Sequence, residues 1–134
     1  MFDHVGVVVT DLKASGAVYR GLMEAIGNRL LEDHSQPDGT GWLVFGTGAP
    51  ESPFFVLAAG RATFWREGDE AGKSPDHLAF RAPSRAAVDA FHAAGLAAGL
   101  KNNGDPGVRR GRYYCGFLID PDGNNVEAGV YADG

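Results

Sequence analysis

The sequence predicts an α+β fold in which a βαβββ module occurs twice within a single domain of 134 residues. The first supporting observation is a repeated opening, since Asp3-His4 and Asp76-His77 each precede a short apolar run. The second is that a residue suited to start a helix follows each run, and the third is that short β-rich runs follow each helix. The expected boundaries are about 1–60 for module one, about 61–74 for a polar linker and about 75–131 for module two.

In the first module, alternating apolar residues predict a strand at about 4–9. Asp11 is a suitable N-cap, because its short side chain can accept hydrogen bonds from the amides of the first helical turn. Apolar residues then recur at helical spacing as far as Ile26, and Gly27 suits the end of the helix. The strands expected after this helix are Arg29–Glu32, Trp42–Phe45 and Pro53–Ala58.

The second module repeats this order with a weaker helical pattern. Ser84 is the expected N-cap and Gly99 the expected end of the helix. The segment Lys101–Arg112 is loop-like, with only a poor strand candidate near Val108. The last two strands are expected at Tyr113–Ile119 and Asn125–Tyr131, separated by the turn Asp120-Pro121-Asp122-Gly123.

Three of the expected strands each carry one side chain that can bind a metal ion. Because successive side chains of a strand point to opposite faces, His4, His77 and Glu127 lie opposite the apolar residues of their strands. Small residues flank each of them, which indicates a concave site instead of a packed core. Two histidines and a carboxylate would leave coordination positions open for water or substrate. Spacing alone leaves open whether the three converge, and local satisfaction of each side chain is the alternative.

The motifs that carry these residues resemble the vicinal oxygen chelate superfamily, which includes glyoxalases, bleomycin-resistance proteins and extradiol dioxygenases. The motifs are Asp3-His4-Val5-Gly6, Asp76-His77-Leu78-Ala79-Phe80 and Asp120-Pro121-Asp122-Gly123-Asn124-Asn125-Val126-Glu127. The resemblance covers about Phe2 to Tyr131. It implies paired modules whose mixed sheets curve into a cup around a divalent metal, a homodimer, and His4, His77 and Glu127 as ligands.

The resemblance also implies a function and its cofactor. We expect a small lyase or isomerase whose divalent zinc, manganese, nickel or iron ion chelates vicinal oxygens of an organic substrate and stabilises an oxyanion or enediolate. Glyoxalases carry a further glutamate on the last strand of the first module, and 53–58 contains no carboxylate, which argues against glyoxalase I activity. A non-catalytic antibiotic-binding protein and a ring-cleaving dioxygenase are the alternatives.

Candidate catalytic residues are Glu127 and Tyr114, and the candidate substrate-pocket residues are Phe55, Trp42, Tyr113 and Arg112. The alternative is that these aromatic residues pack in the core and that the arginine is solvated. Three other residues are expected outside the chemistry: His34 and His92 as exposed side chains, and Cys115 as a small buried one.

Composition excludes some partners. Acidic residues outnumber basic ones by 17 to 12, the net charge is −5, and no basic run exists, so nucleic acid is not an expected partner. No apolar segment approaches the length of a membrane span, and the N-terminus lacks a signal-peptide pattern. We therefore expect a cytoplasmic protein that binds a small molecule.

Overall fold

A computed structural model describes residues 1–60 and 77–131, and it confirms the predicted α+β fold. The first module contains β1 (His4–Val8), α1 (Leu12–Ala25), β2 (Arg29–Asp33), β3 (Gly41–Gly46) and β4 (Phe54–Ala59). The second contains β5 (Leu78–Arg81), α2 (Arg85–Ala97), β6 (Lys101–Arg110), β7 (Tyr113–Ile119) and β8 (Asn125–Tyr131). The expected linker at 61–74 lies outside the described residues.

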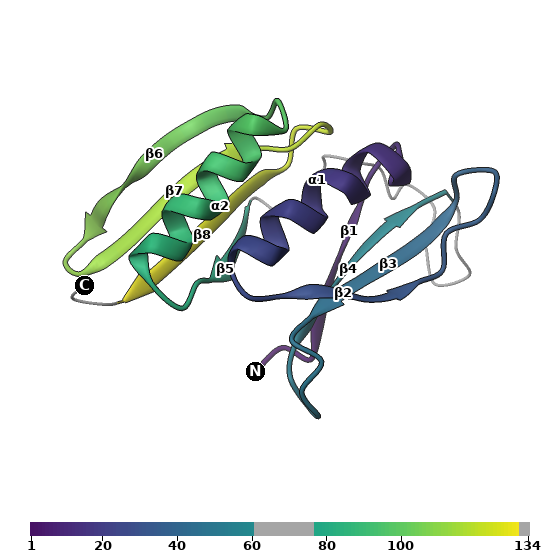
Figure 1. The fold of residues 1–134 in the computed structure, drawn as a ribbon, viewed down its shortest axis with the longest axis horizontal. Helices are drawn as coiled ribbons and strands as arrows, with labels where there is room; N and C mark the ends of the chain where they lie inside the picture. The colour runs from purple at the N-terminus through teal and green to yellow at the C-terminus, as the bar shows by residue number, and fades with distance from the viewer. Residues whose placement is uncertain (61–76, 132–134) are drawn as a thin grey trace.

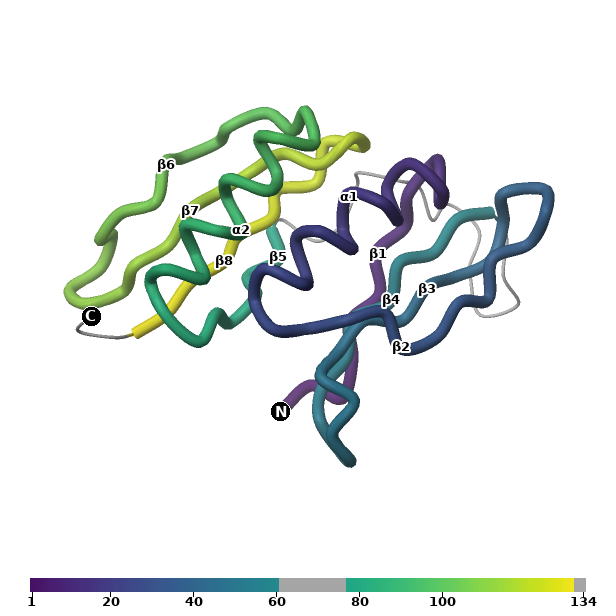
Figure 2. The backbone as a smooth tube through the Cα atoms, viewed as in Figure 1, coloured from purple at the N-terminus to yellow at the C-terminus, as the bar shows by residue number. Residues whose placement is uncertain are grey.

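The two modules have the same topology. Each forms a four-stranded mixed sheet, with the strand orders β1-β4-β3-β2 and β5-β8-β7-β6. In each sheet the first strand of the module pairs in parallel with its last strand, and the remaining pairs are antiparallel. Figure 1 shows the two sheets on either side of a central pair of helices, and Figure 2 follows the same path along the backbone.

The predicted helix signals are confirmed. The Asp11 carboxylate accepts a hydrogen bond from the Ala14 amide at 3.0 Å, and the Ser84 hydroxyl accepts one from the Ala87 amide at 3.1 Å. Gly27 and Gly99 follow the two helices with φ of +88°, a conformation that only glycine adopts at little cost. Each module therefore begins its helix and ends it by the same local chemistry.

The core lies between each helix and the sheet of its own module, and the helices also contact each other. Glycine permits a close approach on both sides: a Cβ at Gly16 would overlap Leu43, and a Cβ at Gly95 would overlap Leu118. Within residues 1–60 and 77–131, no helix covers the other face of either sheet, and we call that face the open face of its module.

A polar network joins the modules at the turn between β7 and β8. The hydroxyl of Tyr19, on α1, donates to the Asp120 carboxylate at 2.7 Å, and both residues are buried. The Thr10 amide donates to the Asp122 carboxylate at 3.1 Å. The predicted turn is confirmed, since Gly123 has φ of +89° and its amide donates to the Asp120 carbonyl at 3.0 Å. This turn therefore also fixes the second module against the first.

The expectation that the segment 101–112 is mostly loop was wrong, because β6 is a ten-residue strand; the strand candidate near Val108 lies within it. The strand contains Pro106 and two glycines, which lower β propensity, and its register with β7 shifts three times. Its position at the edge of the sheet explains this tolerance, since bulges there accommodate residues that cannot continue a regular ladder.

The prediction that His92 is exposed was also wrong. His92 is 5% exposed on the sheet-facing side of α2, together with Val88 and Phe91, and its Nε2 lies 3.0 Å from the Asn102 side-chain oxygen. The other two expectations of this kind are confirmed, since His34 is exposed and Cys115 is buried. Among the described residues, no helix is long and apolar enough to span a membrane.

Candidate functional site

Two of the three predicted metal ligands meet on the open face of the second module. His77 immediately precedes β5, and Glu127 lies on the neighbouring strand β8, in register with Ala79. The His77 Nε2 is 3.6 Å from a carboxylate oxygen of Glu127. The Glu127 side chain is only 6% exposed, whereas His77 is 45% exposed. A buried carboxylate thus lies beside an accessible imidazole.

Two side chains of β7, Tyr113 and Cys115, interact with Glu127. Burial raises the pKa of Tyr113, and the neighbouring Glu127 carboxylate raises it further. Burial likewise raises the pKa of the Cys115 thiol, and the Glu127 carboxylate raises it further. The Tyr113 ring lies across Gly129, where a Cβ would overlap its hydroxyl. Glycine at this position is therefore what lets Tyr113 reach the carboxylate.

Tyr114, the predicted catalytic tyrosine, lies on the opposite face of β7. Its hydroxyl donates to Asp89 of α2 at 2.6 Å, and the guanidinium carbon of Arg85 lies 5.1 Å from its ring centroid. The structure does not place Tyr114 beside Glu127. Alternation separates the two tyrosines, but the register with β8 decides which one faces Glu127. Tyr113 shares that face.

The third predicted ligand, His4, lies on the open face of the first module. Its Nδ1 is 2.7 Å from the Asp3 carboxylate, and its ring stacks on Phe54 with centroids 4.6 Å apart. Because a carboxylate only accepts, Nδ1 carries a proton, and in the neutral imidazole Nε2 keeps its lone pair. Metal-binding histidines typically donate from the ring nitrogen that does not bind the metal to a carboxylate, which orients the ring.

A cavity of about 450 Å³ lies against this open face and is lined by His4 and Trp42. The predicted pocket residue Phe55 is instead 5% exposed on the core side, where its ring contacts Tyr19 and Phe80. Phe55 and Phe54 alternate, and Phe54 is the one that lines the cavity. Arg112 is exposed in the turn between β6 and β7.

The equivalent strand pairs of the two modules, β1–β4 and β5–β8, carry different side chains on their open faces. His4 occupies the place of His77, and Gly6 occupies the place of Ala79. Gly6 pairs with Val56, whereas Ala79 pairs with Glu127. The first module therefore has an aliphatic side chain where the second has its carboxylate, in agreement with the absence of a carboxylate from 53–58.

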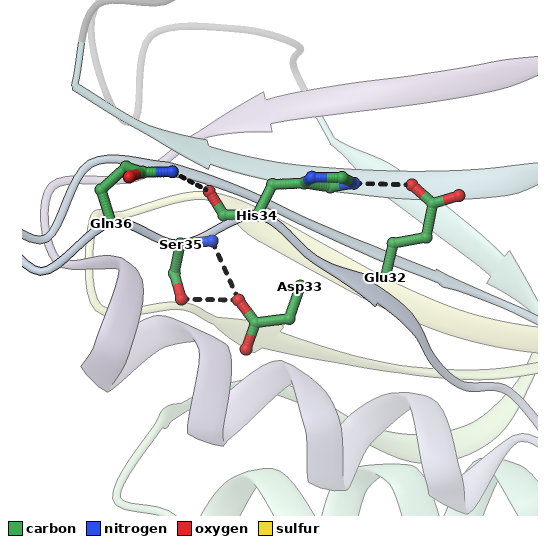
Figure 3. A network of polar contacts seen from close by, with 5 residues as sticks. All are labelled: Glu32, Asp33, His34, Ser35 and Gln36. Carbon is green, nitrogen blue, oxygen red and sulfur yellow. Dashed lines mark hydrogen bonds and ion pairs between the residues drawn. The ribbon is translucent and has the colours of Figure 1, made fainter.

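Glu32 is a cavity residue that the sequence analysis missed. It lies on β2, at the edge of the sheet farthest from β1, and lines the same cavity as His4. Its carboxylate accepts from the His34 imidazole at 2.9 Å (Figure 3). The register of β2 shifts between Leu30 and Glu32, so strand alternation could not reveal which way this side chain points.

The donor types fit a divalent metal ion. Two ligands about 2.1 Å from one ion at a tetrahedral angle are about 3.4 Å apart, close to the 3.6 Å between His77 and Glu127. His4 belongs to the other sheet, and within residues 1–60 and 77–131 of one chain no three His, Cys, Asp or Glu side chains gather closely enough to hold a metal. One chain therefore presents its predicted ligands on two separate open faces.

Known proteins share both the sequence pattern and this architecture. The family described as the glyoxalase/bleomycin resistance protein/dioxygenase superfamily matches residues 1–128. No curated protein sequence matches the chain. A glyoxalase/bleomycin resistance protein from Albidiferax ferrireducens T118 is 30% identical, with a TM-score of 0.76 over 96% of this chain and 98% of that one.

More distant structures share the fold. A putative glyoxalase from Bacillus halodurans is 22% identical, with a TM-score of 0.71 over 96% of this chain and 94% of its own. The fosfomycin resistance protein FosX from Mesorhizobium loti is 17% identical, with a TM-score of 0.63 over 99% of this chain and 93% of its own. Together with the paired βαβββ modules, the match over residues 1–128 establishes that this chain belongs to the glyoxalase/bleomycin resistance protein/dioxygenase superfamily.

Proposed function

We propose that this protein is a small metalloenzyme, a lyase or isomerase, that holds a divalent metal ion through His4, His77 and Glu127. The observation that carries the proposal is the buried Glu127 carboxylate, which lies 3.6 Å from His77 on an open sheet face. Burying a carboxylate is costly unless a cation or several donors compensate for its lost hydration. Tyr113 and Cys115 can compensate for part of this cost, and a zinc, manganese, nickel or iron ion would compensate for the rest.

The chain's own residues have distinct tasks in this proposal. Asp3 orients the His4 ring, and Tyr113 and Cys115 are the donors available to hold the Glu127 carboxylate in place. When bound, the metal supplies Lewis-acid stabilisation of an oxyanion on a substrate that presents two adjacent oxygens. The cavity beside His4 accommodates the rest of the substrate and shields it from water.

A second copy of the chain completes the ligand set in this proposal. His4 lies on the open face of one sheet, and His77 and Glu127 lie on that of the other. We therefore propose a homodimer in which module one of each chain faces module two of its partner. Two-fold symmetry then produces two identical sites, each with three ligands.

Metal analysis tests the ligand assignment. Protein purified without chelator should contain about one divalent metal per chain, and His4→Ala, His77→Ala and Glu127→Ala should each lose most of it. His34→Ala is the matched control, because this exposed histidine is not one of the three proposed ligands. Its replacement should leave the metal content unchanged. Full metal content in all three ligand variants would exclude the assignment.

Mixing variants tests whether the site is shared. In a heterodimer of His4→Ala and Glu127→Ala chains, one of the two shared sites keeps all three ligands. Random reassociation should therefore restore about a quarter of the wild-type metal content. If all three ligands instead come from one chain, the mixture restores none.

A second candidate function is non-catalytic binding of a small molecule. It is favoured by Val56, which stands where a fourth carboxylate would lie, and by the aromatic wall formed by Trp42 and Phe54. A metal-free protein that cannot be reconstituted with zinc, manganese, nickel or iron, yet still binds ligands, would support this function over the first.

A further inference from the structure

The cavity beside His4 has a second polar end that the proposed metal site does not use. Strand order places β1 and β2 at opposite edges of the sheet, so His4 and Glu32 mark opposite ends of the same cavity. Trp42, on β3, lines the cavity between them and lies next to the Glu32 end. The cavity of about 450 Å³ is large enough for a drug-sized molecule.

The Glu32 end of the cavity carries a negative charge that no cationic lining residue among those described offsets. Among the described residues that line the cavity, Glu32 is the carboxylate and none is Lys or Arg. The imidazole of His34 donates to Glu32 at 2.9 Å, and in its neutral form this imidazole leaves the carboxylate charge in place. Half of the Glu32 side chain or more is exposed, so the carboxylate is accessible to a ligand.

The side chains at this end are held in place by their neighbours. The His34 ring stacks on Trp42, with centroids 4.6 Å apart and planes 24° from parallel. The preceding carboxylate, Asp33, accepts from the amide of Ser35 at 2.9 Å and fixes the corner that carries His34 (Figure 3). Glu32, His34 and Trp42 therefore form one ordered group, which we call the rim triad.

We infer that the rim triad binds the protonated amine or quaternary ammonium group of an organic ligand. A carboxylate beside an indole ring is a favourable pairing for such a cation, because both the charge and the ring quadrupole attract it. The apolar side chains between Trp42 and His4 would contact the body of the ligand. This inference rests on the proposed function in one respect, since it names organic cations as the substrate class of the same site.

Calorimetric titration with simple probes tests the inference. Benzyltrimethylammonium is the cationic probe, and benzylsulfonate is an anion of similar shape. The wild-type protein should bind the cation at least about tenfold more tightly than the anion, and Glu32→Gln should weaken cation binding by about tenfold. Glu24→Gln removes the same charge from an exposed position on α1 and should change the affinity less than about twofold.

Two further measurements separate the possible causes of failure. Trp42→Leu removes the ring and should also weaken cation binding, and near-ultraviolet circular dichroism reports whether that variant remains folded. Metal content should be the same in Glu32→Gln as in the wild-type protein, because Glu32 is not a proposed ligand. If the wild-type protein binds no metal but still prefers the cationic probe, the proposed function is contradicted and the inference about the rim triad stands. Equal binding of both probes, or unchanged cation binding in Glu32→Gln, would overturn the inference.

Discussion

Replacing Tyr19 by phenylalanine should destabilise the whole chain, because its hydroxyl joins α1 to the turn of the second module. Tyr19 is 0% exposed, and its hydroxyl is 2.7 Å from an Asp120 oxygen that accepts one other hydrogen bond, from the Asn124 side chain at 2.7 Å. The other Asp120 oxygen accepts the amides of Asp122 and Asn124. The substitution therefore removes one of four donors from a buried carboxylate.

The magnitude follows from the charge and burial of the acceptor. Hydrogen bonds to charged groups contribute about 1.5 to 3 kcal/mol, and the burial of Asp120 at 4% exposure favours the upper part of this range. We expect the free energy of unfolding to fall by about 2 to 3 kcal/mol. For a chain of 134 residues this corresponds to a decrease of roughly 7 to 11 °C in Tm.

Urea denaturation and calorimetry measure the effect, and a double-mutant cycle with Asp120→Asn isolates the pair. The control is Tyr131→Phe, since Tyr131 is 66% exposed and should lose less than about 0.5 kcal/mol. A cost below about 0.5 kcal/mol for Tyr19→Phe, or the same cost with and without Asp120, would refute the reasoning.

Three further expectations concern Gly129, the pH dependence due to Tyr19, and His92. Gly129→Ala should cost roughly 1 to 3 kcal/mol and lower metal affinity, because the new Cβ displaces Tyr113; unchanged denaturation and metal titrations would contradict this. Burial and Asp120 raise the pKa of Tyr19 above its ordinary value of 10.0, so the unfolded chain loses this proton first as pH rises. The free energy of unfolding should therefore fall above about pH 10, and Tyr19 should contribute about 1.4 kcal/mol per pH unit to this fall. Denaturation measured at several pH values should show that Tyr19→Phe lacks this contribution. His92→Ala should cost roughly 1 to 3 kcal/mol in the same assay, since it leaves a gap beside Asn102; a neutral result would show that the pair is dispensable.

Local signals in the sequence were sufficient to predict most of the fold. The caps at Asp11 and Ser84 and the glycines that end both helices depend on nearby backbone groups, so they can be recognised without tertiary information. The strand β6 could not be predicted in this way, because pairing with β7 overrides the poor β propensity around Pro106.

Strand alternation was sufficient to predict which residues of the candidate site lie opposite the apolar core. Alternation separates Glu127 from its apolar neighbours, but it cannot show which tyrosine of the adjacent strand reaches it, since that depends on register. Nor could it detect Glu32, which follows a bulge. The burial of His92 did have a signal, because it continues the helical spacing of Val88 and Phe91.

The pairing of Gly6 with Val56 has a consequence for how the two modules diverged from one another. If a single ancestral unit was duplicated, the equivalent pair of strands now carries a carboxylate in one copy and an isopropyl group in the other. Three protein donors leave at least one position on a tetrahedral ion for an incoming molecule, and a fourth donor at 56 would fill it. If the proposed site holds a metal, loss of symmetry at this single position would exchange tighter metal retention for access, and Val56 would be the residue that sets metal affinity against reactivity.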